Sequence, residues 1–188
     1  MHETLVERVD VATGKLLTLR HDTVADVAGE RHLREVVVHR GGVAVVPLLD
    51  DGRLLLVRQY RHAVGEALLE IPAGTLDRLA DGSLEPPDEA VKRELAEETG
   101  HSAREWRPLG YFFTAPGFTT EKMYLYLATG LAPIDDYDGP EADERLEVEQ
   151  VTLADALRMA DTGDIRDAKT LVGVFWAGRL AEQDLLNR

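Results

Sequence analysis

The alternation of hydrophobic and polar positions predicts mainly strands in the first part of the chain and helices at its end. Near the N-terminus, alternating segments separated by turn-like residues predict strands at 4–11, 15–22 and 32–39. Three short strands bury little apolar surface alone, so we expect them to pair with another surface. We therefore divide the chain into an N-terminal β-strand module, residues 1–40, and a main domain, residues 41–188.

The main domain begins with a continuous apolar run, which is typical of a buried strand. Strands are predicted at residues 43–49, 53–60, 67–74, 106–115, 121–130 and 146–151. Helices are predicted at residues 87–99, from residue 152 onwards, and at about 167–186. The first of these helices has the usual asymmetric ends, with Pro87 at its start and Gly100 just after its last turn. This order of elements predicts an α/β or α+β sandwich.

The composition of the 188-residue chain narrows the class of function. The formal net charge of −14 argues against a nucleic-acid surface, which normally carries a basic patch. The absence of cysteine excludes disulfides, thiolate zinc sites and cysteine nucleophiles. No apolar run approaches the ~20 residues that span a bilayer, and the first residues lack a signal-peptide pattern. We therefore expect a cytoplasmic protein whose partners include neither nucleic acid nor a membrane.

The first predicted helix carries carboxylates on its apolar side. On a helical wheel with about 100° per residue, Glu94 and Glu98 fall inside the apolar stripe, and Glu97 borders it one turn after Arg93. Two inward carboxylates are costly as bare ions, and a hard divalent cation such as Mg²⁺ offsets that cost. The spacing alone leaves two interpretations open, a metal site and a solvated acidic helix.

The same segment resembles the Nudix box, a motif in which glycine, glutamate, an Arg-Glu pair and a Glu-Glu pair follow one another at fixed spacing. The matching residues are Glu85, Arg93, Glu94, Leu95, Glu97, Glu98 and Gly100. The leading glycine is matched by Gly74, but ten residues rather than five separate it from Glu85, which we interpret as a small insertion in the loop. His101 stands where the family carries an aliphatic residue. Neither departure touches the carboxylates, so the box indicates a Nudix hydrolase.

Segments around the box are similar to those of the ADP-ribose pyrophosphatase branch of the family. They are residues 58–62, 69–74 and 115–122, and Pro116 lies sixteen residues after Gly100, where that branch carries a proline. The resemblance implies a Nudix α/β/α sandwich with a mixed sheet, plus a small N-terminal antiparallel sheet. It also implies a homodimer, because the N-terminal strands of that branch are exchanged across a two-fold axis.

The activity that the resemblance implies is Mg²⁺-dependent hydrolysis of the diphosphate in ADP-ribose, which yields AMP and ribose 5-phosphate. The partner is then a nucleoside diphosphate-sugar substrate. One alternative is another nucleotide-sugar or dinucleotide diphosphatase on the same scaffold. A second alternative is a non-catalytic module that senses ADP-ribose, although such a module is expected to lose glutamates that are intact here.

The resemblance assigns residues to the metal and to the chemistry. The implied metal ligands are the backbone carbonyl of Ala73 and the carboxylates of Glu94, Glu97 and Glu98, which would hold two or three Mg²⁺ or Mn²⁺ ions. Arg93 is the implied brace of these carboxylates, a task that suits bidentate pairing.

The catalytic base of this branch comes from a loop outside the box. Glu144 matches it best when residues are counted back from the strand at 146–151, and Glu141 and Asp143 are alternatives. Without the resemblance, a solvated acidic loop is the simpler interpretation of this segment.

The implied substrate contacts are Arg61, Arg58, Glu70 and Glu121. Arg61 matches the arginine that holds the diphosphate, and Glu121 lies where the branch binds the terminal ribose. For the arginines the alternative is a surface salt bridge, and Glu70 could instead hold its loop. The first 59 residues contain no Phe, Tyr or Trp, so the residue that stacks on adenine stays open among His32, Arg34 and Tyr60.

Overall fold

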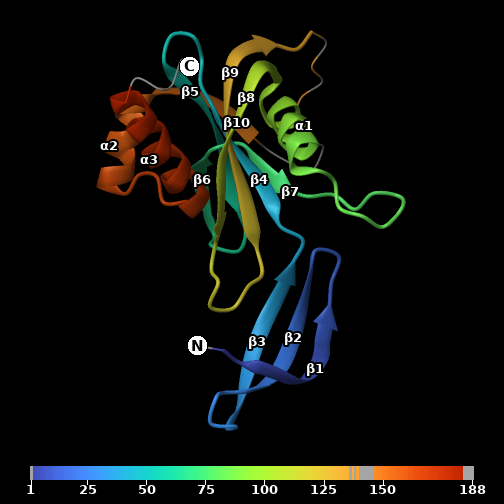
Figure 1. The fold of residues 1–188 in the computed structure, drawn as a ribbon. Helices are drawn as coiled ribbons and strands as arrows, with labels where there is room; N and C mark the ends of the chain where they lie inside the picture. Colours follow the sequence, from blue (N-terminus) through green and yellow to red (C-terminus); the bar gives the residue numbers. More distant parts are fainter. Residues whose placement is uncertain (1, 136, 138, 140–145, 184–188) are drawn as a thin grey trace. The chain divides into compact units, whose positions relative to one another are not determined.

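The computed structural model describes residues 2–135, 137, 139 and 146–183. The chain forms two compact units (Figure 1). Unit 1 comprises Met1–Gly41 with Phe113–Lys122, and unit 2 comprises Gly42–Phe112 with Met123–Arg188. The N-terminal module anticipated at residues 1–40 thus forms most of unit 1, and a segment from the middle of the chain joins it.

Unit 1 is built on a three-stranded antiparallel sheet in the order β1-β2-β3. β1 spans Thr4–Thr13, β2 spans Leu17–Ala25 and β3 spans Arg31–His39, so the three predicted N-terminal strands are confirmed. Asp26 shapes the turn between β2 and β3, because its carboxylate accepts hydrogen bonds from the amides of Ala28 and Glu30. All ten residues of β1 are exposed in the single chain.

The segment Phe113–Lys122 belongs to unit 1 through its pairing with β3. The amide of Val37 donates to the carbonyl of Phe118 at 2.7 Å, and the amide of Thr120 donates to the carbonyl of Val37 at 3.0 Å. The hydroxyl of Thr120 accepts the amide of His39, 81 residues earlier in the chain. Sequence periodicity did not predict this contact, because periodicity reports only on neighbouring residues.

Unit 2 contains two sheets. The mixed sheet has the order β7-β4-β9-β8, where β4 (Gly42–Pro47) runs parallel to β9 (Lys122–Pro133) and antiparallel to β7 (Ala73–Thr75). β8 spans His101–Phe113 and forms the edge next to β9. The second sheet is antiparallel, with the order β10-β5-β6, and its strands are β10 (Leu146–Thr152), β5 (Arg53–Arg61) and β6 (Glu66–Glu70).

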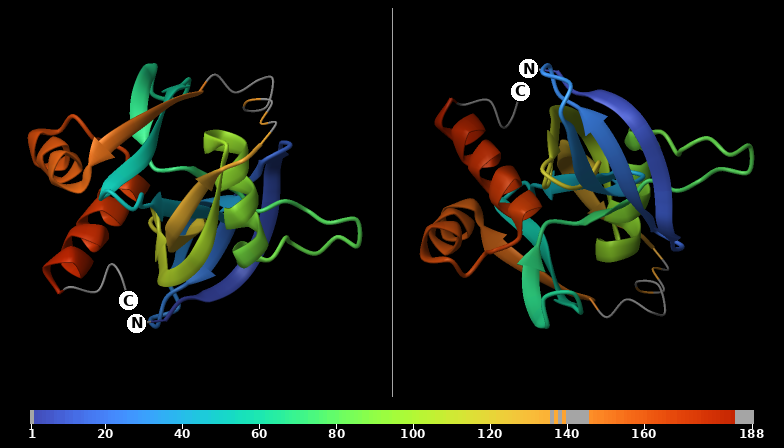
Figure 2. Two further views of the ribbon diagram at one scale, coloured as in Figure 1. Left: turned by 90° about the horizontal axis from the view of Figure 1, so that it is seen from above. Right: turned by 90° about the horizontal axis from the view of Figure 1, so that it is seen from below.

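Helices lie on opposite sides of unit 2, as Figures 1 and 2 show, with α1 on one side and the pair α2 and α3 on the other. α1 spans Pro87–Thr99, α2 spans Leu153–Thr162 and α3 spans Ala168–Glu182. β4 is buried on both faces: Val43 and Val45 pack with α1, whereas Ala44 and Val46 belong to the core that α2 and α3 cover. The predicted α/β/α sandwich with a mixed sheet is therefore confirmed.

Two predicted strand boundaries are wrong for physical reasons. The segment predicted as one strand at residues 67–74 is two strands in different sheets, and the break falls at Pro72, which has no amide hydrogen to donate to a ladder. β8 begins at His101, five residues before the predicted start. Its first residues are mostly exposed and polar, so they lack the hydrophobic alternation that marks a strand.

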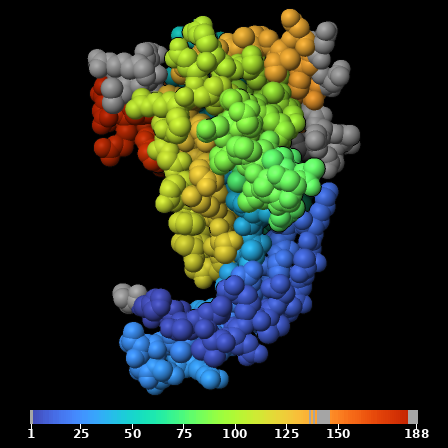
Figure 3. Space-filling model, turned by 45° about the vertical axis from the view of Figure 1, so that its right-hand side comes forward, coloured from blue at the N-terminus to red at the C-terminus, as the bar shows by residue number. Residues whose placement is uncertain are grey.

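The residues that we interpret as an insertion in the box lie in the loop between β7 and α1. Residues 76–86 extend away from the core of unit 2 and are drawn in bright green on the face shown in Figure 3. The loop has internal contacts, because Arg78 and Leu84 form an isolated antiparallel β-bridge and the amide of Gly82 donates to the carbonyl of Leu79.

Among the described residues, no helix combines the length and apolar content that crossing a bilayer requires.

Candidate metal and substrate site

α1 places two of its glutamates toward the protein interior. Glu94 is 8% exposed and Glu98 is 3% exposed, whereas the side chain of Glu97 is 37% exposed. The helix ends at Gly100, whose φ of 66° lies in the left-handed region that favours glycine. The inward direction predicted from the helical wheel is confirmed, and a fully solvated acidic helix is excluded.

The first residues of β7 lie directly against these two carboxylates. The amide of Ala73 donates to Oε2 of Glu98 at 3.0 Å. A Cβ atom added to Gly74 would lie only 1.8 Å from Oε1 of Glu94, so a side chain at this position would displace that carboxylate. The absence of a side chain at Gly74 is therefore what lets the strand and the helix approach so closely.

Arg93 holds the outer carboxylates of the cluster together. Its guanidinium donates to Glu85 at 2.9 and 3.2 Å and to Glu97 at 2.8 Å, and it lies 2.9 Å from Oε1 of Glu94. The hydrogen bonds to Glu85, with the charges of Glu94 and Glu97, raise the pKa of Arg93 well above its usual value. Hydrogen bonding to Arg93 in turn lowers the pKa of Glu85. Arg93 thus contacts three carboxylates of the cluster at once.

The donor set suits a hard divalent cation. Glu94, Glu97 and Glu98 present carboxylate oxygens, which are ligands of the kind that Mg²⁺ and Mn²⁺ prefer. Arg93 supplies one positive charge to a group of carboxylates that carries several negative charges. The excess negative charge is the property that lets such a cluster accept a cation.

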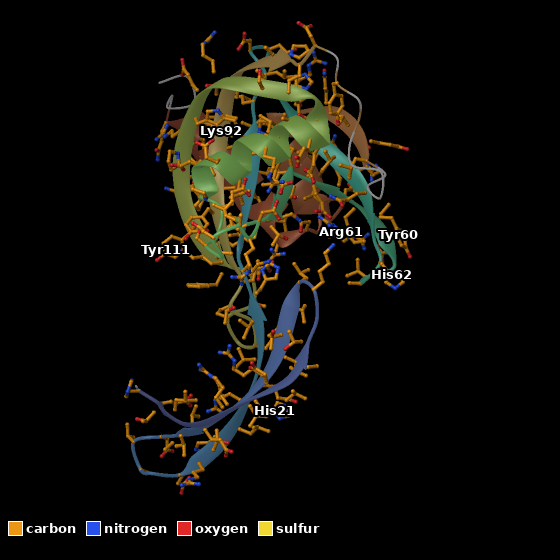
Figure 4. All side chains as sticks on the ribbon, turned by 90° about the vertical axis from the view of Figure 1, so that its right-hand side faces the viewer. His21, Tyr60, Arg61, His62, Lys92 and Tyr111 are labelled. Atoms are coloured by element: carbon orange, nitrogen blue, oxygen red, sulfur yellow. The ribbon has the colours of Figure 1, made fainter. Side chains whose placement is uncertain are left out.

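The structure brings together two of the predicted substrate residues. Arg61 ends β5, beside the exposed Tyr60 (Figure 4), and donates through Nε and Nη2 to the two oxygens of Glu70 at 2.8 and 2.7 Å. These hydrogen bonds raise the pKa of Arg61, and the charges of Glu98 and Asp167 act in the same direction. Glu98 of α1 thus acts on the charge of Arg61, although β5 belongs to the other sheet.

The other predicted contacts lie in different surroundings. Arg58 pairs across the sheet with Glu149 of β10 at 2.5 Å. Glu121 belongs to unit 1, where it accepts the hydroxyl of Thr114 at 2.6 Å and lies 3.4 Å from Nδ1 of His39. The proposed base, Glu144, and its alternatives Glu141 and Asp143 lie outside the described residues.

The candidates for stacking on adenine are also placed. His32 and Arg34 both lie on β3, where His32 is 3.3 Å from a carboxylate oxygen of Asp26 and Arg34 donates to Glu3. Tyr60 is 62% exposed on β5. The sequence did not point to Lys169, which contacts Glu70 from the start of α3, or to Asp167, which contacts Lys169. Asp167 could have been found as a helix cap, but nothing local connects Lys169 with Glu70, 99 residues earlier.

Comparisons with known proteins agree with this geometry. The chain matches the NUDIX domain over residues 38–172. It is 33% identical over 174 residues to an ADP-ribose pyrophosphatase of Bacillus subtilis, a match that covers 93% of this chain and 91% of the relative. An ADP-ribose pyrophosphatase of Mycobacterium tuberculosis is 38% identical over 163 residues, covering 87% and 77% of the two chains.

Two further matches widen the range of substrates named among similar proteins. A GDP-mannose pyrophosphatase of Klebsiella pneumoniae is 34% identical over 159 residues, which cover 80% of this chain and 77% of that relative. A crystal structure described as an ADP compounds hydrolase superposes with a TM-score of 0.82 at 25% identity, covering 98% of this chain and 97% of the other. All of these relatives align over most of their own length.

Proposed function

Because the chain belongs to the Nudix family, we propose that it hydrolyses the diphosphate of ADP-ribose and releases AMP and ribose 5-phosphate. The observation that carries the proposal is the contact between the inward carboxylates, Glu94 and Glu98, and the start of β7 at Ala73 and Gly74. This contact places the carboxylate oxygens of Glu94 and Glu98 beside the backbone of Ala73 and Gly74. The names of the two ADP-ribose pyrophosphatases supply the substrate class.

The metal ligands we propose are the carboxylates of Glu94, Glu97 and Glu98 and the carbonyl of Ala73. The residues fit Mg²⁺ or Mn²⁺, and we propose two or three ions because the cluster has more carboxylates than one cation neutralises. When bound, such ions polarise phosphoryl oxygens and lower the pKa of a water molecule. Arg93 holds Glu94 and Glu97 in place from the side of Glu85.

Arg61 is the residue that we propose binds the diphosphate. Its Nε and Nη2 are occupied by Glu70, and within the described residues its Nη1 forms no hydrogen bond. The side chain is 39% exposed, so the outer edge of the guanidinium can reach a phosphate oxygen. Glu70 then orients Arg61, and Arg58 and Glu121 remain proposed substrate contacts.

The proposed base is Glu144, which would take a proton from the attacking water. We expect Glu144→Gln to lower kcat at least ~100-fold with little change in metal affinity, because the change removes the basic oxygen and no metal ligand. Steady-state kinetics with a Mg²⁺ titration measure both quantities. If Glu141→Gln or Asp143→Asn lowers kcat instead, the base is the neighbouring carboxylate.

A second candidate function is hydrolysis of another nucleotide-sugar. The observation that favours it is the similarity to GDP-mannose pyrophosphatases, at an identity close to that of the ADP-ribose pyrophosphatases. The lack of an aromatic residue in the first 59 positions leaves the base of the nucleotide without an obvious platform there. A module that only senses ADP-ribose is disfavoured by the intact set of box glutamates.

One assay separates these functions. The protein is incubated with Mg²⁺ and, in turn, ADP-ribose, GDP-mannose, other ADP-sugars, NADH and ATP, and the released nucleoside monophosphate is quantified. We expect the highest kcat/KM with ADP-ribose. A higher value with GDP-mannose would replace the substrate but keep the reaction class, and no turnover on any member would remove the hydrolase proposal.

We also propose that the protein is a homodimer that assembles through unit 1. The support is the exposed β1 strand, on which Leu5, Val9 and Val11 are 47–49% exposed in the single chain. A strand with this much apolar surface is typically covered by a partner. Sedimentation equilibrium should give twice the 20.8 kDa chain mass, and a mass of one chain at micromolar concentration would contradict the proposal.

A further inference from the structure

Glu70 is the most enclosed carboxylate near the proposed substrate arginine. It is 1% exposed, and two cations approach it from different elements. Arg61 of β5 pairs with both of its oxygens, and Nζ of Lys169, from the first turn of α3, donates to Oε2. Burial raises the pKa of Glu70, but the two cations outweigh it, and the pKa lies below its ordinary value. A doubly paired buried carboxylate is thus charged at neutral pH.

The first turn of α3 is itself fixed in several ways. Asp167 caps the helix by accepting the amide of Thr170 at 2.9 Å, and it also accepts Nζ of Lys169 at 2.8 Å. The hydroxyl of Thr170 accepts the amide of Ile71 at 2.9 Å. Lys169 is therefore held between two carboxylates, and its side chain is only 14% exposed.

Close packing holds the same part of α3 against Ile71, the residue that follows β6. A Cβ atom added to Gly173 would lie 2.9 Å from Cδ1 of Ile71, so the helix approaches this side chain at a position that has no side chain of its own. Glu70 and Ile71 are the two residues just before the turn at Pro72 that carries Ala73. The start of α3 is thus attached to the strand that leads into the proposed metal site.

The four charged groups of this cluster form a chain in which positive and negative charges alternate. This arrangement affects how freely the arginine at one end can bind a phosphate. Arg61 and Lys169 carry positive charge, and Glu70 and Asp167 carry negative charge. If Arg61 were the only cation beside Glu70, a diphosphate that binds Arg61 would compete with Glu70 for the same guanidinium. A buried carboxylate left without a partner is strongly destabilising. With Lys169 present, Glu70 keeps a cation while Arg61 shares its guanidinium with the substrate.

We propose that Lys169 is a positioning residue for substrate binding. It neutralises Glu70, so that Arg61 can bind the diphosphate. Lys169 does not touch the substrate in this proposal, and it takes no part in the chemical step. The inference rests on the proposed function, because it takes the ligand of Arg61 to be a diphosphate. Nothing in the box or its neighbouring segments indicates this lysine, which lies about 70 residues downstream on α3.

The test compares Lys169→Met with the conservative Lys169→Arg. Lys169→Met should raise KM for ADP-ribose at least ~10-fold while kcat changes less than ~3-fold, because the lost charge weakens ground-state binding through Arg61. The Kd of ADP-ribose measured by calorimetry without metal should rise by a similar factor. Lys169→Arg should restore both values to within ~3-fold of wild type, since it returns the cation.

Two controls separate positioning from general stability. Lys92→Met is the matched control, because Lys92 lies on α1 (Figure 4) and forms an exposed pair with Glu89. Its KM and Kd should equal those of wild type. In a Glu70→Gln background, Lys169→Met should raise KM less than ~3-fold, since the carboxylate through which Lys169 acts is gone. If Lys169→Met does not fold, Lys169→Gln replaces it, with the same expected rise in KM and Kd.

The outcomes are distinguishable. Unchanged KM and metal-free Kd in Lys169→Met would overturn the positioning role, even if the thermal midpoint falls. A rise in KM that persists equally in the Glu70→Gln background would also overturn it, because Lys169 would then act by another route. If the wild-type protein does not hydrolyse ADP-ribose, the proposed function is contradicted instead. The substrate assay measures this hydrolysis without any variant.

Discussion

Two clusters of charge in unit 2 differ in their ratio of cations to carboxylates. On α1, the single guanidinium of Arg93 contacts the carboxylates of Glu85, Glu94 and Glu97. Between β6 and α3, the single carboxylate of Glu70 contacts two cations, Arg61 and Lys169. Negative charge is in excess in the first cluster, and Glu70 itself is fully compensated in the second.

The difference teaches which kind of ligand each cluster can accept. A cluster with excess carboxylates gains when a divalent cation arrives, whereas an arginine whose carboxylate has another cation is available to an anion. One short stretch of chain connects the two, because Ile71 donates to Thr170 of α3 and Ala73 donates to Glu98 of α1. A metal-bound diphosphate needs both properties within one site.

The largest effect is expected from removing charge in the carboxylate cluster. Glu98→Gln should lower kcat at least ~100-fold and leave the fold intact, because it removes a metal ligand and little packing. Steady-state kinetics with ADP-ribose, together with circular dichroism, measure both. Glu89→Gln on the exposed side of the same helix is the matched control and should retain wild-type kcat. Near-normal activity of Glu98→Gln would contradict the ligand role.

An intermediate effect is expected where the start of β7 touches the same cluster. In Gly74→Ala the new methyl would lie 1.8 Å from Oε1 of Glu94, so that carboxylate must move. The displaced atoms are the end of a flexible side chain, so we expect ~10-fold lower kcat with a change in stability below about 1 kcal/mol. Chemical denaturation and kinetics separate the two.

Gly14→Ala is the control for the glycine change itself. The added methyl would meet only the carbonyl of Leu17 at 3.5 Å, an ordinary contact in the β1–β2 turn of unit 1. Its kcat should equal that of wild type. If Gly74→Ala is also fully active, the approach of β7 to Glu94 has no bearing on the reaction.

The carboxylate cluster could be predicted from the sequence, whereas the compensated one could not. The inward direction of Glu94 and Glu98 follows from the 3.6-residue period within one helix, and the helix bounds at Pro87 and Thr99 follow from its caps. The pairing of Lys169 with Glu70 joins residues 99 apart, and no local pattern encodes it. Such contacts depend on how the strands and helices pack, which periodicity does not specify.

Two of the arginines of β5 show the same limit of the sequence. Arg58 and Arg61 are three residues apart, so in a strand they face opposite sides of the sheet. The sequence identified both as substrate candidates but did not tell which carboxylate each would meet. The structure gives Arg58 a partner on β10 and Arg61 a partner on β6. A resemblance to a family motif predicts which residues are candidates. Their contacts with other side chains depend on the order of the strands in the sheet.

The smallest effect is expected from lowering the pH, which should reduce the stability of the fold. The two clusters can be compared directly by this measurement. Arg93 lowers the pKa of Glu85, and Arg61 with Lys169 lowers that of Glu70 despite its burial, both from an ordinary value of 4.5. Carboxyls of lowered pKa stabilise the fold above pH 4.5, and this stability is lost as the pH falls through their folded-state values.

We therefore expect the free energy of unfolding in urea, without metal, to fall between pH 6 and pH 3. In Glu70→Gln and in Glu85→Gln the fall should be smaller by about 1 kcal/mol each, because one such carboxyl is gone in each variant. Glu105→Gln, an exposed carboxyl of β8, controls for surface charge. If Glu70→Gln loses as much stability in acid as wild type, Glu70 is not held charged by Arg61 and Lys169. A reduced fall in Glu85→Gln alone would restrict the acid-sensitive pairing to the cluster around Arg93.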